Sequence, residues 1–236
     1  MVIRHVAGRL YGVGVDRLSP HPLLVLVGRA GLAHHPLHGE PLYAHALRAL
    51  TDAVGPAMVV TDRGEVARVT REVARWRRDT RVFAGDEWWD AVRDDRDRGI
   101  VAHDVLCPLV GADFIGSVVD RARLRPGVSF VGVQAVTDTL KTVVDGTIRG
   151  TIDRERVATV TSPVVMAPAV LEALDGPPPV ADFADVVTWL RERGEVELVK
   201  APSLGRRLEG ERGIHLLESL DEVGHRVRTT RGPGSS

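Results

Sequence analysis

The sequence has few of the features that place a chain outside ordinary globular proteins. Only one of its 236 residues, Cys107, is a cysteine, which excludes a disulfide within the chain and favours a reducing compartment. No apolar run reaches membrane-spanning length, and the segment from Met1 to His5 lacks the apolar block of a secretory signal. The 31 Lys and Arg residues are matched by 32 Asp and Glu, so the net charge of -1 draws the chain to neither nucleic acid nor anionic membranes. We therefore expect a cytoplasmic protein with neither as its partner.

What is present is typical of one globular domain. Hydrophobic residues make up 44% and charged residues 27% of the chain, and the length suits a single α/β domain with a sizeable core. We predict that this domain spans residues 1–225. From Arg226 to Ser236 the sequence has no apolar periodicity, and we expect a flexible tail there.

Short apolar runs alternate with segments of helical periodicity along most of the chain. The run from Leu23 to Val27 is continuous, as in a strand that is buried on both faces. Apolar residues at helical spacing follow it between Tyr43 and Leu50. Further strands are expected at 57–60, 81–84, 100–103, 128–133 and 196–200, with helices between and after them. This alternation predicts a Rossmann-like α/β fold, a mostly parallel sheet flanked by helices.

The segment from Asp138 to Thr151 breaks that alternation. It carries β-branched residues on both sides of Asp145-Gly146, and an Asp-Gly pair in this setting is a strong hairpin signal. A hairpin here has no crossover helix to pack it onto the sheet. We therefore predict that residues 137–155 form a β-hairpin arm that projects from the domain.

The order of several motifs resembles the 2-C-methyl-D-erythritol 4-phosphate cytidylyltransferase family of isoprenoid biosynthesis. The similarity spans roughly residues 22–220. It is carried by Gly39-Glu40-Pro41-Leu42, Val101-Ala102-His103-Asp104 with Pro108-Leu109-Val110, Asp138-Thr139-Leu140-Lys141, Thr151-Ile152-Asp153-Arg154 and Ser162-Pro163. His-Asp alone is weak, whereas the ordered series is fairly specific.

The resemblance implies a nucleotide-diphospho-sugar transferase-like fold and a homodimer formed through the arm. It also implies a reaction in which CTP and a sugar-alcohol phosphate are joined, with Mg²⁺, and pyrophosphate is released. The residues it assigns are Arg29, Asp104 and Arg206 for catalysis, with Asp104 also on the metal; Thr139, Lys141, Arg154 and Ser162 for the sugar phosphate; and Gly28, Gly31 and Gly85 for the nucleotide. The two arginines would neutralise phosphate charge.

The sequence departs from the family pattern at four places. The Gly-rich loop after the first strand is short and has no Lys, so Arg29 is its one fixed cation. Cys107 stands where an Arg is expected, and Ala91 where a Ser is expected. Thr-Pro-Gln is replaced by Ser162-Pro163-Val164. Three hypotheses stay open: an active cytidylyltransferase-like enzyme, a catalytically degenerate binding or scaffolding homodimer, and a transferase for another NTP or sugar phosphate.

The same motifs also have purely structural interpretations. Gly28 to Gly31 could be a plain strand-to-helix turn, and Asp104 could cap the following helix. The arm could be only a dimer clasp. Trp88 and Trp89 could stack on a base, although a core or interface role is the more common one. Cys107 is more typical of a small buried residue than of a nucleophile, and the loop histidines His34, His35 and His38 of solvated side chains than of metal ligands.

Overall fold

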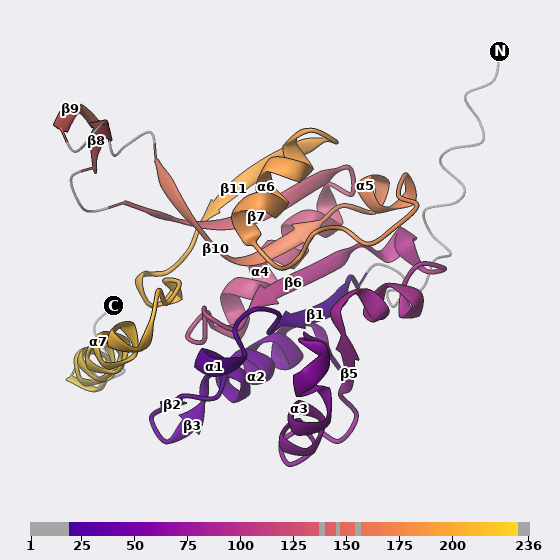
Figure 1. Cartoon of the computed structure of the whole chain (residues 1–236), viewed down its shortest axis with the longest axis horizontal. Helices are drawn as coiled ribbons and strands as arrows, with labels where there is room; N and C mark the ends of the chain where they lie inside the picture. Colours follow the sequence, from indigo (N-terminus) through magenta and orange to yellow (C-terminus); the bar gives the residue numbers. More distant parts are fainter. Residues whose placement is uncertain (1–18, 137–139, 145–146, 154–156, 231–236) are drawn as a thin grey trace.

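The computed structural model describes residues 19–136, 140–144, 147–153 and 157–230. It confirms the predicted α/β fold, because a seven-stranded sheet of order β11-β7-β10-β6-β1-β4-β5 lies between two layers of helices (Figure 1). Within these residues, no helix combines the length and apolar character that crossing a membrane requires.

The parallel strands lie close to where the apolar runs predict them. β1 (His21–Val25) pairs in parallel with β4 (Met58–Thr61) on one side and with β6 (Ile100–Asp104) on the other. β5 (Arg81–Ala84) extends the sheet beyond β4. β11 (Glu195–Lys200) pairs in parallel with β7 (Val128–Ala135) at the opposite edge. Burial of both faces explains why these strands read as continuous apolar runs.

One central strand was not predicted. β10 (Ala158–Met166) lies antiparallel between β6 and β7, directly after the segment that we expect to form the arm. Its pairing with β7 shifts register between Val160 and Val164. A Cβ atom at Gly132 would lie 2.4 Å from the Ser162 carbonyl oxygen, so only glycine allows this close approach of β7 to β10.

Helices cover both faces of the sheet. Successive side chains from Leu23 to Val25 in β1 point to opposite faces and are all apolar, so each face needs a covering layer. Leu24 belongs to the core beneath α2 (Leu42–Val54) and α4 (Ala112–Leu124), together with the buried side of α3 (Val66–Val73). Leu23 and Val25 belong to the opposite core, beneath α5 (Pro168–Glu172), α6 (Phe183–Arg191) and the 3-10 helix η3 (Gly85–Ala91). The sheet is therefore buried on both faces.

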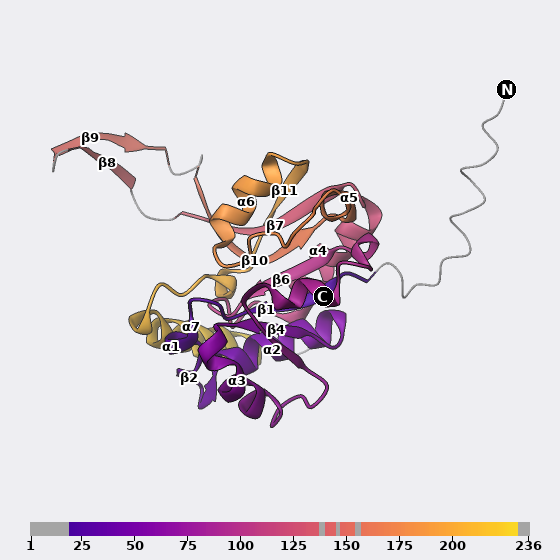
Figure 2. The same ribbon diagram turned by 45° about the vertical axis from the view of Figure 1, so that its right-hand side comes forward.

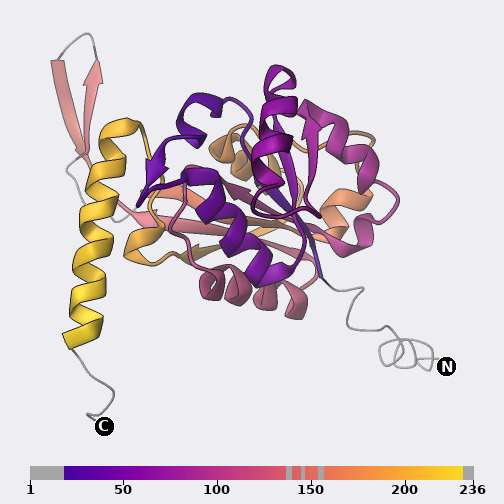
Figure 3. The ribbon, with the colours of Figure 1, turned by 90° about the horizontal axis from the view of Figure 1, so that it is seen from below.

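The last helix is longer than the sequence suggests. α7 (Glu211–Thr230) continues past Arg226, where we expect the tail to begin, and leads away from the sheet (Figure 3). Ile214 and Leu217 are buried, whereas Leu216 and Leu220 on another side of the helix are exposed. Leucines on both the buried and the exposed side blur the apolar stripe of the helix, so its full length is hard to recognise from sequence.

The hairpin falls where the Asp-Gly pair predicts it. β8 (Leu140–Val144) pairs antiparallel with β9 (Thr147–Ile152) in a sheet of their own. Figures 1 and 2 show these two strands standing away from the main sheet, beyond the ends of β7 and β10. The projecting arm is confirmed as a feature of the fold, while its exchange with a second subunit stays a prediction.

Candidate functional site

The candidate site lies where β1 and β6 end. From β1 the chain continues to β4 and β5 on one side of β1, and it then returns to form β6 on the other side. The connections therefore run in opposite directions from β1 and β6. In open α/β sheets such a divergence at the carboxyl ends of parallel strands is the usual place for a ligand. The residues after β1 and the last residue of β6, Asp104, meet there.

Asp104 is completely buried and is held by two arginines. Arg29 places Nε 2.8 Å from Oδ1 as an ion pair, and its Nη2 donates to Oδ2 at 3.2 Å. Arg207 donates from Nε to the same Oδ2 at 2.9 Å. The Leu106 backbone N–H donates to Oδ1 at 3.0 Å. Two guanidinium groups around one buried carboxylate leave the cluster with one excess positive charge.

Neighbouring groups fix this cluster in place. The Ser162 hydroxyl, fully buried on β10, accepts the Asp104 backbone N–H at 2.8 Å. Arg29 also donates to the Val27 carbonyl oxygen and is only 8% exposed. Burial lowers the pKa of Arg207, but the charge and hydrogen bond of Asp104 outweigh it and raise that pKa. Arg207 therefore stays charged at any physiological pH, and about a third of its side chain is open to solvent.

A hollow lies next to this cluster. A cavity of about 720 Å³ is lined by residues 206–213 and by Leu216. Arg206 and Arg207 both line it, and Arg207 is the one that reaches Asp104. Arg206, which the resemblance assigns to the phosphate, is exposed at the cavity, so it lies near the cluster without contact to Asp104.

The predicted nucleotide loop is compact, and some of its hydrogen-bonding groups already have partners within the protein. Gly28 has a φ of +71°, which glycine adopts without strain, and its N–H donates to Oδ2 of Asp62 at 3.0 Å. Gly31 lies in α1 (Ala30–Ala33), a helix of a single turn. Gly85 has a φ of +49° and begins η3, at the end of β5. All three lie at the same edge of the sheet as Asp104, after β1 and β5.

The substrate residues predicted on the arm are placed only in part. Thr139 and Arg154 lie outside the described residues. Lys141 lies in β8, opposite Thr151. Their predicted contacts to a sugar phosphate stay predictions.

Asp104 does not fit a metal ion in this arrangement. Both of its carboxylate oxygens already receive N–H groups from two arginines and the backbone. Among the described residues, no three His, Cys, Asp or Glu side chains are grouped closely enough to hold an ion. Mg²⁺ binding in proteins relies on free carboxylate oxygens or on substrate phosphates. The Mg²⁺ that the resemblance implies therefore stays a prediction, and no step is derived through it.

Two of the structural interpretations hold, for the tryptophans and for Cys107, and the one for Asp104 is wrong. Trp88 and Trp89 are both buried and pack edge to face, with ring centroids 5.8 Å apart. Cys107 is buried beside the Thr161 hydroxyl, and burial raises the pKa of its thiol to about 12, which excludes a thiolate nucleophile. Asp104 accepts from Leu106 two residues later and does not cap α4, which begins after Gly111.

The loop histidines pair with carboxylates rather than lying free in solvent. His34 lies 2.7 Å from Glu72 of α3, measured from Nδ1 to Oε2. His35 and His38 lie 3.2 Å from Glu211 and Asp221 of α7. The short loop between β1 and α2 is thereby joined to two helices that follow much later in the sequence.

Sequence reasoning missed two polar residues of the site, Arg207 and Asp62. Arg206 and Arg207 are adjacent in sequence, and nothing in their order shows which one turns inward. Asp62 directly follows β4, the strand next to β1. A carboxylate just after a parallel strand was the available signal, because such residues gather at the ligand-binding edge.

Comparison with known proteins gives likeness in structure but not in sequence. No protein-family model and no curated protein sequence matches the chain. A 4-diphosphocytidyl-2C-methyl-D-erythritol synthase from Anaerococcus prevotii superposes with a TM-score of 0.66 at 12% identity, over 88% of this chain and 98% of that one. A second structure of a protein of that name gives a TM-score of 0.65 at 17% identity, over 86% and 98%. The 2-C-methyl-D-erythritol 4-phosphate cytidylyltransferase from Thermus thermophilus gives 0.61 at 20% identity, over 85% and 98%. The chain has the fold of these cytidylyltransferase structures over most of its length.

Proposed function

We propose that this protein is a nucleotidyltransferase that binds a nucleoside triphosphate and a sugar-alcohol phosphate at the ends of β1 and β6. The observation that carries the proposal is the buried Arg29–Asp104–Arg207 cluster beside a cavity, at the point where the connections of the sheet diverge. The fold shared with cytidylyltransferase structures supports CTP as the nucleotide and methylerythritol phosphate as the acceptor.

In the proposed reaction a phosphate oxygen of the acceptor attacks the α-phosphorus of CTP. A P–O bond forms, the bond between the α- and β-phosphates breaks, and pyrophosphate leaves with the electron pair. Arg207, partly open to the cavity, would face the negative charge that builds up on the phosphates. Asp104, held by Ser162 and Leu106, would keep both guanidinium groups oriented before the substrate arrives.

Release of pyrophosphate tests this function directly. Purified protein at high concentration would be incubated with Mg²⁺, each of the four NTPs, and methylerythritol phosphate or related polyol phosphates. We expect release with one NTP and acceptor, and a loss of about 100-fold or more in Arg207→Gln, which removes a preorganised cation. Arg78→Gln, a change at an exposed arginine, should retain the rate. No release with any pair would overturn the enzymatic proposal.

A second candidate function is a binding homodimer without transferase activity. One specific observation favours it: the groups that would hold a triphosphate are already satisfied within the chain. Arg29 is bound to Asp104 and Val27, and the Gly28 N–H is bound to Asp62. A triphosphate would have to displace these partners at a free-energy cost.

Calorimetry compares the candidates at the nucleotide site, while sedimentation tests the homodimer that both of them imply. Calorimetric titration with CTP and with sugar phosphates, in the absence of turnover, shows whether the site binds ligand at all. Sedimentation of the full chain and of a variant with residues 140–152 replaced by a short turn tests the arm. We expect the full chain to be a dimer and the variant a monomer; a monomeric full chain would contradict the homodimer.

A further inference from the structure

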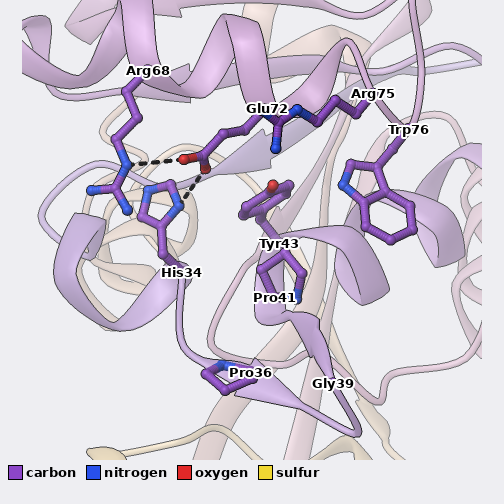
Figure 4. A pocket seen from close by; sticks show the side chains of 9 residues that line it. All are labelled: His34, Pro36, Gly39, Pro41, Tyr43, Arg68, Glu72, Arg75 and Trp76. Carbon is purple, nitrogen blue, oxygen red and sulfur yellow. Dashed lines mark hydrogen bonds and ion pairs between the residues drawn. The ribbon is translucent and has the colours of Figure 1, made fainter.

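A second hollow lies on the α2 and α3 side of the molecule, away from Asp104. It is a cavity of about 430 Å³ between the segment from His34 to Pro41 and these two helices. Figure 4 shows its lining, in which Tyr43 comes from α2, Arg68 and Glu72 come from α3, and Arg75 and Trp76 follow α3. Gly39 and Pro41 belong to a motif of the resemblance, but none of the residues assigned to catalysis, nucleotide or sugar phosphate lines this cavity.

Among the charged side chains that line this cavity, some form ion pairs with one another and one does not. Glu72 forms an ion pair with Arg68 at 3.1 Å, and its Oε2 lies 2.7 Å from Nδ1 of His34. The side chain of His34 is itself nine-tenths buried and packs edge to face on Tyr43. Arg75 is exposed, and it has no ion pair or hydrogen bond to another side chain within the described part of the chain. One cation is therefore left over in a lining that is otherwise balanced.

The cavity also offers aromatic and apolar surface. Trp76 is 42% exposed, which is unusual for the largest side chain in a protein of few aromatics. Pro36 and Pro41 add apolar ring surface, whereas Tyr43, only 3% exposed, adds little. In the view of Figure 4 the guanidinium of Arg75 lies between the side chain of Glu72 and the hydroxyl end of Tyr43, with the ring of Trp76 to one side. A second cation, Arg48, lies 6.0 Å from the centroid of the Trp76 ring.

From these features we infer that the cavity binds a small anionic ligand with a planar heteroaromatic ring, of the nucleoside monophosphate class. The ring would stack on Trp76 against the prolines, as bases stack on exposed aromatic side chains. The phosphate would lie on Arg75, with Arg68 near by, because a guanidinium binds phosphate in a bidentate manner. A volume of about 430 Å³ lies in the range of small-molecule sites.

Such a ligand would also touch the loop that joins the two sites. His34, Pro36, Gly39 and Pro41 line this cavity, and Arg29 of the Asp104 cluster lies five residues before His34. Binding would hold this loop against α3. The inference itself does not rest on the proposed transferase function, because it uses none of that site's residues.

Fluorescence of Trp76 provides the primary test. Trp88 and Trp89 are buried, and the partly buried Trp189 lies on α6 against the opposite core, so stacking of a ligand on Trp76 should account for the ligand-dependent change in emission. Titration of the full chain with AMP, GMP, CMP and UMP should quench the emission with at least one of them. The matching nucleoside, which lacks the phosphate, and ribose 5-phosphate, which lacks the ring, should each bind at least tenfold more weakly.

Calorimetry on variants keeps the test independent of the fluorophore. Arg75→Gln and Trp76→Leu should each weaken binding about tenfold or more, while Arg71→Gln, an exposed arginine of α3 outside the cavity, should bind as the natural chain does. Arg207→Gln should also bind normally. Absence of monophosphate binding, or binding that Arg207→Gln removes and Arg75→Gln leaves unchanged, would overturn the inference. The second of these results would place the ligand at the Asp104 cluster and leave the proposed function intact.

Discussion

The Asp104 cluster and the Trp76 cavity share one loop but use their charges in opposite ways. At the cluster, Arg29 and Asp104 are buried and satisfy each other, and Arg207 completes the pairing. At the cavity, Arg75 and Trp76 are exposed, and the charge of Arg75 is not used by another side chain of the described residues. Buried charges must be paired because removing them from water is costly. An exposed charge is solvated by water and remains available to a ligand.

The comparison teaches that the two sites depend on the fold to different degrees. Loss of Asp104 leaves the buried guanidinium of Arg29 without a counter-charge and threatens the whole domain. Loss of a member of the cavity removes a contact at the surface, where water replaces it. Substitutions in the Asp104 cluster should therefore lower stability, whereas substitutions in the Trp76 cavity should lower ligand affinity.

The largest effect is expected when the cluster loses its carboxylate. Asp104→Asn keeps the size of the side chain but leaves the buried Arg29 guanidinium without a counter-charge. We expect the free energy of unfolding to fall by about 3–5 kcal/mol, the usual cost of breaking a buried ion pair. Urea denaturation followed by circular dichroism measures it.

A surface pair supplies the control for Asp104→Asn. Glu87 pairs with Arg63 at 2.8 Å, and both side chains are more than half exposed. Glu87→Gln should change the free energy of unfolding by less than about 1 kcal/mol. Equal effects of the two substitutions would show that the Asp104 cluster does not stabilise the fold.

The next effect concerns the buried imidazole of His103, which precedes Asp104 in the chain. Its ring is completely buried, neither ring nitrogen has a hydrogen-bond partner among the described residues, and burial lowers its pKa to about 4. In the unfolded chain the imidazole takes up a proton below a pKa of about 6.5, whereas in the folded chain it stays neutral. Stability is therefore fully present above about pH 6.5 and is lost as the pH falls toward 4.

Replacing this imidazole should remove that part of the pH dependence. Between pH 7.5 and pH 5 we expect the natural chain to lose about 2 kcal/mol of unfolding free energy through His103. His103→Leu should lose correspondingly less over the same range. Urea titrations at several pH values measure both slopes, and parallel slopes would contradict the assignment.

The smallest effect should come from the carboxylate beside the loop. Asp62→Asn keeps a hydrogen-bond acceptor for the Gly28 N–H but removes a negative charge from the position where a phosphate would bind. On the proposed function we expect nucleotide affinity to rise several-fold, corresponding to about 1 kcal/mol. Calorimetry with CTP measures this change. Asp79 precedes β5 and lies at the amino ends of the parallel strands, so Asp79→Asn should leave affinity unchanged. Weaker binding in Asp62→Asn would argue against a phosphate at Gly28.

Local sequence signals predicted the parts of the fold that local physics controls. The continuous run at Leu23–Val27 and the Asp145-Gly146 pair each correspond to an element in the expected place. β10 escaped prediction because Ser162-Pro163 lies within it, and a proline inside an apolar run argues against a central strand. The register that makes Gly132 necessary is a property of two strands together.

For the candidate sites, what the sequence determines and what the tertiary structure determines are more clearly separated. The sequence by itself determined that Asp104 ends a buried strand, that Arg29 follows another, and that both therefore reach the same edge of a parallel sheet. Only the tertiary structure decided that Arg207 rather than Arg206 meets Asp104, and that Asp62 accepts the Gly28 N–H. It also decided that no side chain of the described residues forms an ion pair with Arg75. Strand ends follow from apolar periodicity along the chain, whereas charge pairing depends on distances between segments that sequence order does not record.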